Sequence, residues 1–107
     1  MKLIKENIPF LQAVAKLPKK QAKELLSNAN RQQILSIAEV SKNVLARIIQ
    51  LQPDYKGALK RRKLVIRNLA DKELSHKERA EIVVNSSDTV VLLIRAVLKR
   101  LIGLTGK

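Results

Sequence analysis

Apolar residues recur at intervals of three and four positions along most of the chain, which is the spacing of helices that bury one face. Strict alternation of apolar and polar residues, which would indicate half-buried strands, is missing over any useful length. The chain contains three prolines and three glycines, so the residues that most often interrupt helices are few. The pattern therefore predicts an all-α fold, a compact bundle of five to six helices that forms a single helical domain over residues 1–107.

Three helices are expected in the first half of the chain. The first covers about Ile8–Lys16 and carries Pro9 in its first turn, where proline is tolerated. The second opens near Pro18, which also suits a first turn. The third runs from about Asn30 to Leu51, because its apolar residues keep the rhythm of one buried face. These residues are Ile34, Ile37, Ala38, Val44, Leu45, Ile48 and Ile49.

Two further helices are expected between residues 53 and 84. The fourth begins at Pro53 or Asp54, because the residue before a proline disfavours continued helix, and it reaches about Ala70. The fifth begins at Ser75 and ends near residue 84. Ser75 is followed three residues later by Glu78, which is the arrangement of a capping box.

A sixth and most apolar helix is expected from about Asp88 to Ile102, with its end at Gly103. Its apolar face consists of Val90, Leu93, Ile94, Val97, Leu98 and Leu101, whereas Arg95 and Lys99 lie on the opposite side. Such a helix suits the centre of a small core. Basic amphipathic helices can also lie on an anionic membrane or enter the groove of a partner, so both of these uses stay open.

The charge balance indicates which partners the chain attracts. There are 22 Lys and Arg against 9 Asp and Glu, and the formal net charge is +13. A small protein this basic attracts polyanions, foremost nucleic acid, then anionic membranes and acidic proteins. Phe10 and Tyr55 are the only aromatic residues, so the chain lacks a set of platforms on which single-stranded bases could stack. Double-stranded nucleic acid, foremost DNA, is therefore the partner that we expect, and RNA stays open as the alternative.

Location and cofactors are constrained by what the sequence lacks. It contains no cysteine, so it can form neither a disulfide nor a thiolate metal site. The N-terminus has no uninterrupted apolar stretch of signal-peptide length. The run VVLLI is far too short to span a bilayer. These features favour an intracellular protein that is not secreted by the classical route, with the nucleus or a virion as candidate locations.

The stretch KGALKRRKLVIR, residues 56–67, carries six basic side chains and no acidic one, and we call it the basic segment. On a continuous helix Lys56, Lys60, Lys63 and Arg67 share an arc about 60° wide, beside an apolar arc. We expect these four to contact phosphates, with Arg61 in support. A merely solvated helix face is the alternative. Arg62 falls within the apolar arc, which leaves three explanations open. It pairs with an acidic residue, it extends its guanidinium to the surface, or the helical phase is shifted near the start of this helix.

No constellation in the sequence indicates catalysis. His76 is the only histidine, and its place in the first turn of a polar helix favours the surface. Glu78 and Glu81 stand among Lys77 and Arg79, so solvated ion pairs explain them better than acid–base chemistry. Gly-rich phosphate loops and Ser–His–acid arrangements are missing. We therefore expect no enzymatic activity, no metal and no cofactor.

The run YKGALKRRKLVIRNLADKELSHKERAEIVV resembles short basic proteins encoded by adenovirus-like elements of animals, the Polinton and adintovirus group. The upstream run PFLQAVAKLPKKQAKELLSNAN is similar to the start of those proteins, so the resemblance covers most of the chain. The matching positions are Asn43, Val44, Leu45, Ile49, Leu51, Lys60, Arg61, Arg62, Lys63, Arg67, Leu69, Ala70, Asp71, Lys72, Ser75, Lys77 and Arg79.

This resemblance implies a small virion component or genome-associated protein that is not an enzyme. In that family the C-terminal tail often opens with paired glycines before a Leu/Pro-rich segment, similar to the small core peptide of adenoviruses. Here the tail reads NSSDTVVLLIRAVLKRLIG, with neither a glycine pair nor a proline. The resemblance therefore does not extend to roles of that tail, such as proteolytic maturation or membrane disruption. Docking on a capsid or on another acidic partner remains the alternative to DNA binding.

Overall fold

The computed structural model describes residues 2–102, except for the side chain of Ile102, and its chain is helical with no strand in that range. The eight helices are α1 (Lys2–Glu6), α2 (Ile8–Lys16), α3 (Lys19–Ser27), α4 (Arg31–Leu45), α5 (Pro53–Lys60), α6 (Lys63–Ala70), α7 (His76–Asn85) and α8 (Ser87–Ile102). The all-α prediction is confirmed, whereas the expected five to six helices are too few. The predicted stop at Gly103 lies outside the described residues.

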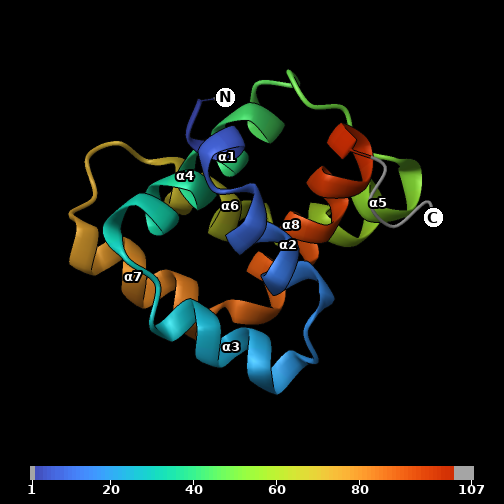
Figure 1. The fold of residues 1–107 in the computed structure, drawn as a ribbon. Helices are drawn as coiled ribbons and strands as arrows, with labels where there is room; N and C mark the ends of the chain where they lie inside the picture. The colour runs from blue at the N-terminus through green and yellow to red at the C-terminus, as the bar shows by residue number, and fades with distance from the viewer. Residues whose placement is uncertain (1, 103–107) are drawn as a thin grey trace.

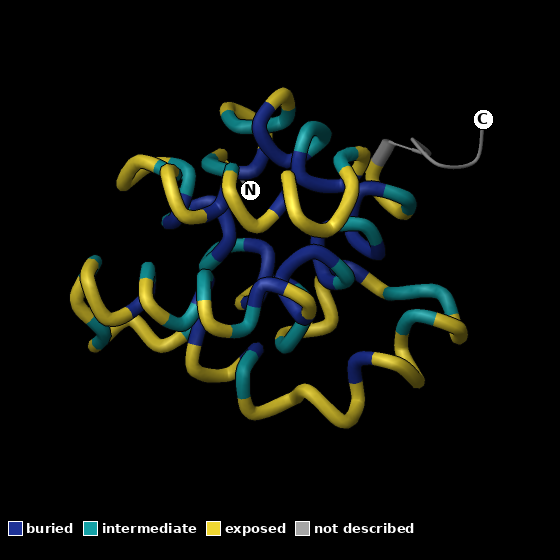
Figure 2. Tube along the Cα trace, turned by 90° about the horizontal axis from the view of Figure 1, so that it is seen from below, coloured by how far each residue is buried: buried dark blue, intermediate teal, exposed yellow. Residues whose placement is uncertain are grey.

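Helix α8 is the centre of the fold, and α2, α3, α4, α5 and α7 all pack against it (Figure 1). Helix α6 lies along α4, and α1 also packs against α4. The principal dimensions are 34 × 26 × 26 Å. Buried positions gather in the interior and exposed positions lie around it (Figure 2). The interior is almost wholly aliphatic, with Phe10 as its one buried aromatic residue among those described.

The first additional helix is α1, which the sequence pattern did not reveal. Its five residues bury only Ile4, whose side chain is fully inaccessible. The backbone N–H of Ile4 donates a hydrogen bond to Glu39 Oε1 of α4 at 2.9 Å. A helix this short is not stable by itself, so its stability comes from these tertiary contacts.

Helix α4 ends at Leu45 and not at Leu51, so the predicted third helix is too long. Arg47 has a φ of 60°, in the left-handed region. Its N–H donates to Val44 O at 3.1 Å, and the N–H of Ile48 donates to Asn43 O at 3.0 Å. This pair of bonds is a Schellman motif, which satisfies the last carbonyls of the helix. Beyond it Ile48 is 62% exposed instead of buried as predicted, whereas Ile49 returns to the core.

An Arg47→Gly variant is expected to be more stable than the wild type by about 0.5 kcal/mol. The left-handed conformation places the Cβ of Arg47 against the following carbonyl, and glycine removes that strain while losing some backbone entropy. Arg47→Ala is the matched control, because it removes the same charge and keeps the Cβ. Urea denaturation followed by circular dichroism should rank glycine above alanine. Equal midpoints for these two variants would contradict this explanation of the helix end.

The start of α7 follows the prediction. Ser75 Oγ accepts a hydrogen bond from the backbone N–H of Glu78 at 3.1 Å, and Glu78 Oε1 accepts one from the N–H of Ser75 at 2.9 Å. The pKa of Glu78 is lowered below its usual value, mainly by the hydrogen bond from the Ser75 backbone and to a smaller extent by the Ser75 side chain. The capping box predicted from the sequence is therefore confirmed, and Glu78 caps the N-terminus of α7.

Candidate nucleic-acid interface

The basic segment is divided between two helices. Helix α5 ends at Lys60 and α6 begins at Lys63, with a turn at Arg61 and Arg62 between them. The N–H of Arg62 donates to Leu59 O at 2.9 Å. This bond joins residues three positions apart, as in a 3₁₀ turn, whereas α-helical bonds join residues four apart. The prediction of one uninterrupted helix from residue 53 to residue 70 is therefore wrong.

Two physical reasons favour this break. In an uninterrupted helix four cations would stand one turn apart along one face, and each neighbouring pair of like charges destabilises a helix by about 0.2–0.5 kcal/mol. The two halves also pack on different partners, because α5 lies against α8 whereas α6 lies against α4. A turn at Arg61 and Arg62 lets Leu59 and Ile66 reach the core from helices of different direction.

All five predicted contact residues lie on the surface. Lys56 and Lys60 belong to α5, Arg61 to the turn, and Lys63 and Arg67 to α6. Each is exposed, and none forms an ion pair with another described residue. The structure therefore does not bring four of them into a single ridge on one helix, as predicted. It places two short basic helices on either side of a basic turn.

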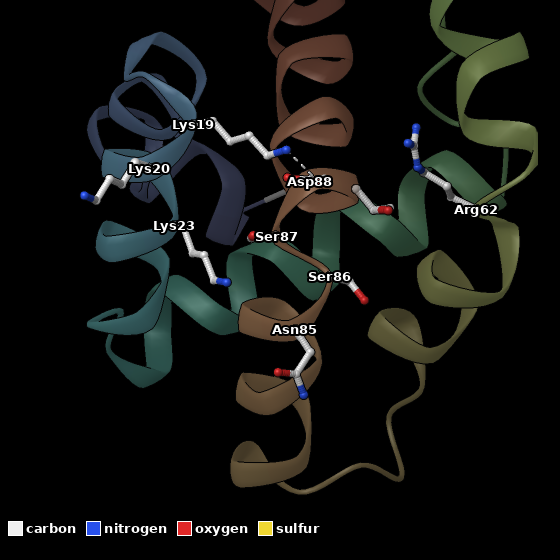
Figure 3. A pocket seen from close by; sticks show the side chains of 9 residues that line it. Lys19, Lys20, Lys23, Arg62, Asn85, Ser86, Ser87 and Asp88 are labelled. Atoms are coloured by element: carbon white, nitrogen blue, oxygen red, sulfur yellow. Dashed lines mark ion pairs between the residues drawn. The ribbon is translucent and has the colours of Figure 1, made fainter.

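Arg62 lies where the sequence pattern did not place it. It is exposed and does not project into the apolar arc, because the turn changes the helical phase. Its side chain faces a hollow of about 720 Å³ that we call the α3–α8 hollow (Figure 3). The other residues around this hollow are Lys19, Lys20 and Lys23 of α3 and residues 85–89, where α7 meets α8.

This second basic cluster was missed by the sequence analysis. The available signal was the spacing of Lys19, Lys20 and Lys23, which places three cations within little more than one turn of α3. Lys19 Nζ lies 3.1 Å from Asp88 Oδ2, with both side chains largely exposed. An exposed pair of this kind contributes at most about 1 kcal/mol to stability. What the sequence could not show is that Arg62 joins these lysines from the other half of the chain.

Arg79 and Arg95 have structural roles. Arg79 is 5% exposed, its Nε donates to Leu69 O at 3.0 Å, and its Nη2 donates to Asp71 O. Arg95 is half-buried, and its Nε donates to Ala15 O at 2.8 Å. Each guanidinium thus binds carbonyls at the end of another helix, α6 and α2 respectively, where a cation is favoured. The expectation of a solvated ion pair for Arg79 is wrong.

Apart from Arg79, Arg95 and Lys99, every Lys and Arg among residues 2–102 is exposed. Lys99 Nζ lies 5.7 Å from the centre of the Tyr55 ring, a cation–π contact between α8 and α5. The described residues include eight exposed carboxylates, of which Asp54 belongs to α5 and Asp88 lines the α3–α8 hollow. Four of them belong to α7 and the connection before it, on the opposite side of the molecule from α5 (Figure 1). These are Asp71, Glu73, Glu78 and Glu81.

His76 is half-buried and not fully on the surface as expected, and its Nδ1 has no hydrogen-bond partner among the described residues. Within residues 2–102 no group of three or more His, Asp or Glu could hold a metal ion. In the same range no helix combines the length and the apolar character required to cross a membrane.

No protein-family model matches this chain, and no curated protein or solved structure matches it. The resemblance to proteins of adenovirus-like elements therefore stays a prediction.

Proposed function

We propose that this protein binds double-stranded nucleic acid, foremost DNA, through phosphate contacts and without strong sequence preference. The observation that supports this proposal most is that the cations of the basic segment are exposed and not paired with any described carboxylate. The five side chains of the basic segment named as contacts are exposed and form no ion pair with another described residue. Lysine and arginine in this state are able to replace the counterions of a nucleic acid backbone.

The arrangement favours phosphates over bases. Helices α5 and α6 have eight residues each, so each is about 12 Å long. Duplex DNA carries a charge every ~1.7 Å along its axis, so a surface of this length meets several phosphates. Helix α7, which carries Glu78 and Glu81, lies on the far side of the molecule from α5 (Figure 1). The resulting asymmetry of charge would orient α5 and the turn toward a polyanion.

The predicted resemblance suggests a biological setting for this function. A virion component or genome-associated protein meets a dense polyanion, and a non-enzymatic basic protein suits that role. Docking on an acidic protein or a capsid uses the same cations and is the second candidate function. Membrane action by α8 explains the charge less well, because most of the apolar residues of α8 lie in the core and would first have to be released. Leu101 is the exception, at 37% exposed.

Binding to unrelated duplexes and to an acidic polypeptide separates these candidates. Two duplexes of about 20 base pairs are expected to bind with affinities within about threefold of each other at equal salt. Polyglutamate of matched total charge should bind more weakly, because its charges do not have the spacing and geometry of phosphates. Fluorescence anisotropy measures all three. Equal or tighter binding of polyglutamate would overturn the proposal in favour of an acidic protein partner.

A further inference from the structure

The N-terminus of α8, the longest helix among the described residues, lines the α3–α8 hollow. Helix α8 begins at Ser87 and has 16 residues. The first N–H groups of such a helix lack an intrahelical partner. The dipole of α8 adds positive charge there, which the C-terminal end of α7 at Asn85 partly offsets. Lys23 extends toward this end of α8, and Arg62 approaches from the turn between α5 and α6 (Figure 3).

Two hydroxyl groups provide an independent observation. Ser87 and Thr89 are 8% and 6% exposed, and both line the hollow. Neither side chain forms a hydrogen bond with any described residue. The oxygen atoms themselves keep some access, because neither is among the fully enclosed side-chain atoms that lack a partner. Their remaining access is to the hollow, so a ligand with acceptor oxygens would satisfy them.

We infer that the α3–α8 hollow is a binding site for one phosphate group. The Ser87 and Thr89 hydroxyls and the first N–H groups of α8 donate to its oxygens, and Lys23 and Arg62 supply charge from two sides. The assignment of that phosphate to a nucleic acid backbone rests on the proposed function. Arg62 is also part of the basic segment, so the contact surface would continue from the turn into the hollow.

Asp88 is the one carboxylate at the hollow, and it opposes an anion there. Its ion pair with Lys19 partly neutralises it. Asp88→Asn is therefore expected to tighten phosphate binding, because it removes the repulsion and keeps the side-chain size.

The test compares Lys23→Gln/Ser87→Ala with Lys72→Gln/Ser27→Ala. Both double variants lose one exposed lysine and one serine hydroxyl, but Lys72 and Ser27 lie outside the hollow. The Ser87 hydroxyl has no partner, so the first variant should fold normally, which the melting temperature checks. Its affinity for an unrelated duplex of about 20 base pairs should fall about tenfold relative to the control variant, through loss of charge-assisted bonds. Asp88→Asn should bind the duplex more tightly than the wild type.

A second arm titrates inorganic phosphate and follows the backbone amides of residues 87–89 by NMR. These amides are expected to shift in the wild type and the control variant, and not in Lys23→Gln/Ser87→Ala. If phosphate moves them but no duplex binds, the site stands and the proposed function is wrong. If duplexes bind and both double variants bind equally, with the amides unmoved by phosphate, the site is wrong and the proposed function stands.

Discussion

Arg79→Ala is expected to lower the free energy of unfolding by about 3 kcal/mol. Arg79 is the most deeply buried cation among the described residues, and it donates hydrogen bonds to the carbonyls of Leu69 and Asp71. Its loss leaves the Leu69 carbonyl at the end of α6 unpaired, whereas the Asp71 carbonyl keeps the hydrogen bond from the Leu74 N–H at 3.3 Å. It also leaves a void beneath the connection to α7. An unsatisfied buried polar group costs about 1–3 kcal/mol, and the void adds to that.

Two further variants make this prediction specific. Arg79→Lys should lie between alanine and the wild type, because an ammonium keeps the charge but not the forked pair of donors. Arg67→Ala should change stability by less than about 0.5 kcal/mol, because Arg67 is an exposed cation on the neighbouring helix. Urea denaturation gives all three values. If Arg79→Ala unfolds at the same urea concentration as Arg67→Ala, Arg79 does not hold the end of α6.

The second large effect concerns binding. Lys60→Glu/Lys63→Glu/Arg67→Glu is expected to weaken duplex binding on the order of 100-fold at low salt. Each lost contact between a cation and a phosphate removes a charge-assisted hydrogen bond that contributes about 1–1.5 kcal/mol or more. The new carboxylates also repel the backbone. All three side chains are exposed and without an ion pair, so the fold should tolerate their replacement.

The control for net charge is Arg31→Glu/Lys42→Glu/Lys72→Glu. These three cations are also exposed, and their reversal changes the net charge by the same amount. They lie outside the basic segment and outside the hollow. The control is expected to lose less than about tenfold, through the general field of the protein alone. Equal losses in the two triple variants would show that binding has no preferred surface.

Local signals predicted much of the fold. The bounds of α2 follow from the spacing of its apolar residues, and the start of α7 follows from Ser75 and Glu78. Both signals act within one helix, so a single sequence contains them in full. The position of α8 in the core also follows from its composition, because a small domain buries its most apolar helix.

The predictions from the sequence are wrong where contacts between residues far apart in the chain determine the structure. The chain turns at Arg61 without a proline or glycine, because α5 and α6 pack on different helices. Helix α4 ends at a left-handed Arg47, where the common residue is glycine. The partners of Arg79 are backbone carbonyls eight and ten residues away, which carry no sequence signature. In each case tertiary packing overrode the local pattern.

The same limit applied to the candidate site. Exposure of Lys56, Lys60, Arg61, Lys63 and Arg67 could be predicted from a run of charge without acidic residues. Their division between two helices could not, because it depends on the turn. The α3–α8 hollow joins side chains from residues 19 to 89 and becomes visible only in the folded chain (Figure 3).

The most direct test of phosphate binding is the salt dependence of duplex affinity for the wild type and Lys60→Glu/Lys63→Glu/Arg67→Glu. If about six phosphates are neutralised, the logarithm of the association constant should fall against the logarithm of salt concentration with a slope near −5. In the variant the slope should be shallower by about 3, because three contacts are lost. A wild-type slope no steeper than about −1, or the same slope in both proteins, would contradict the account.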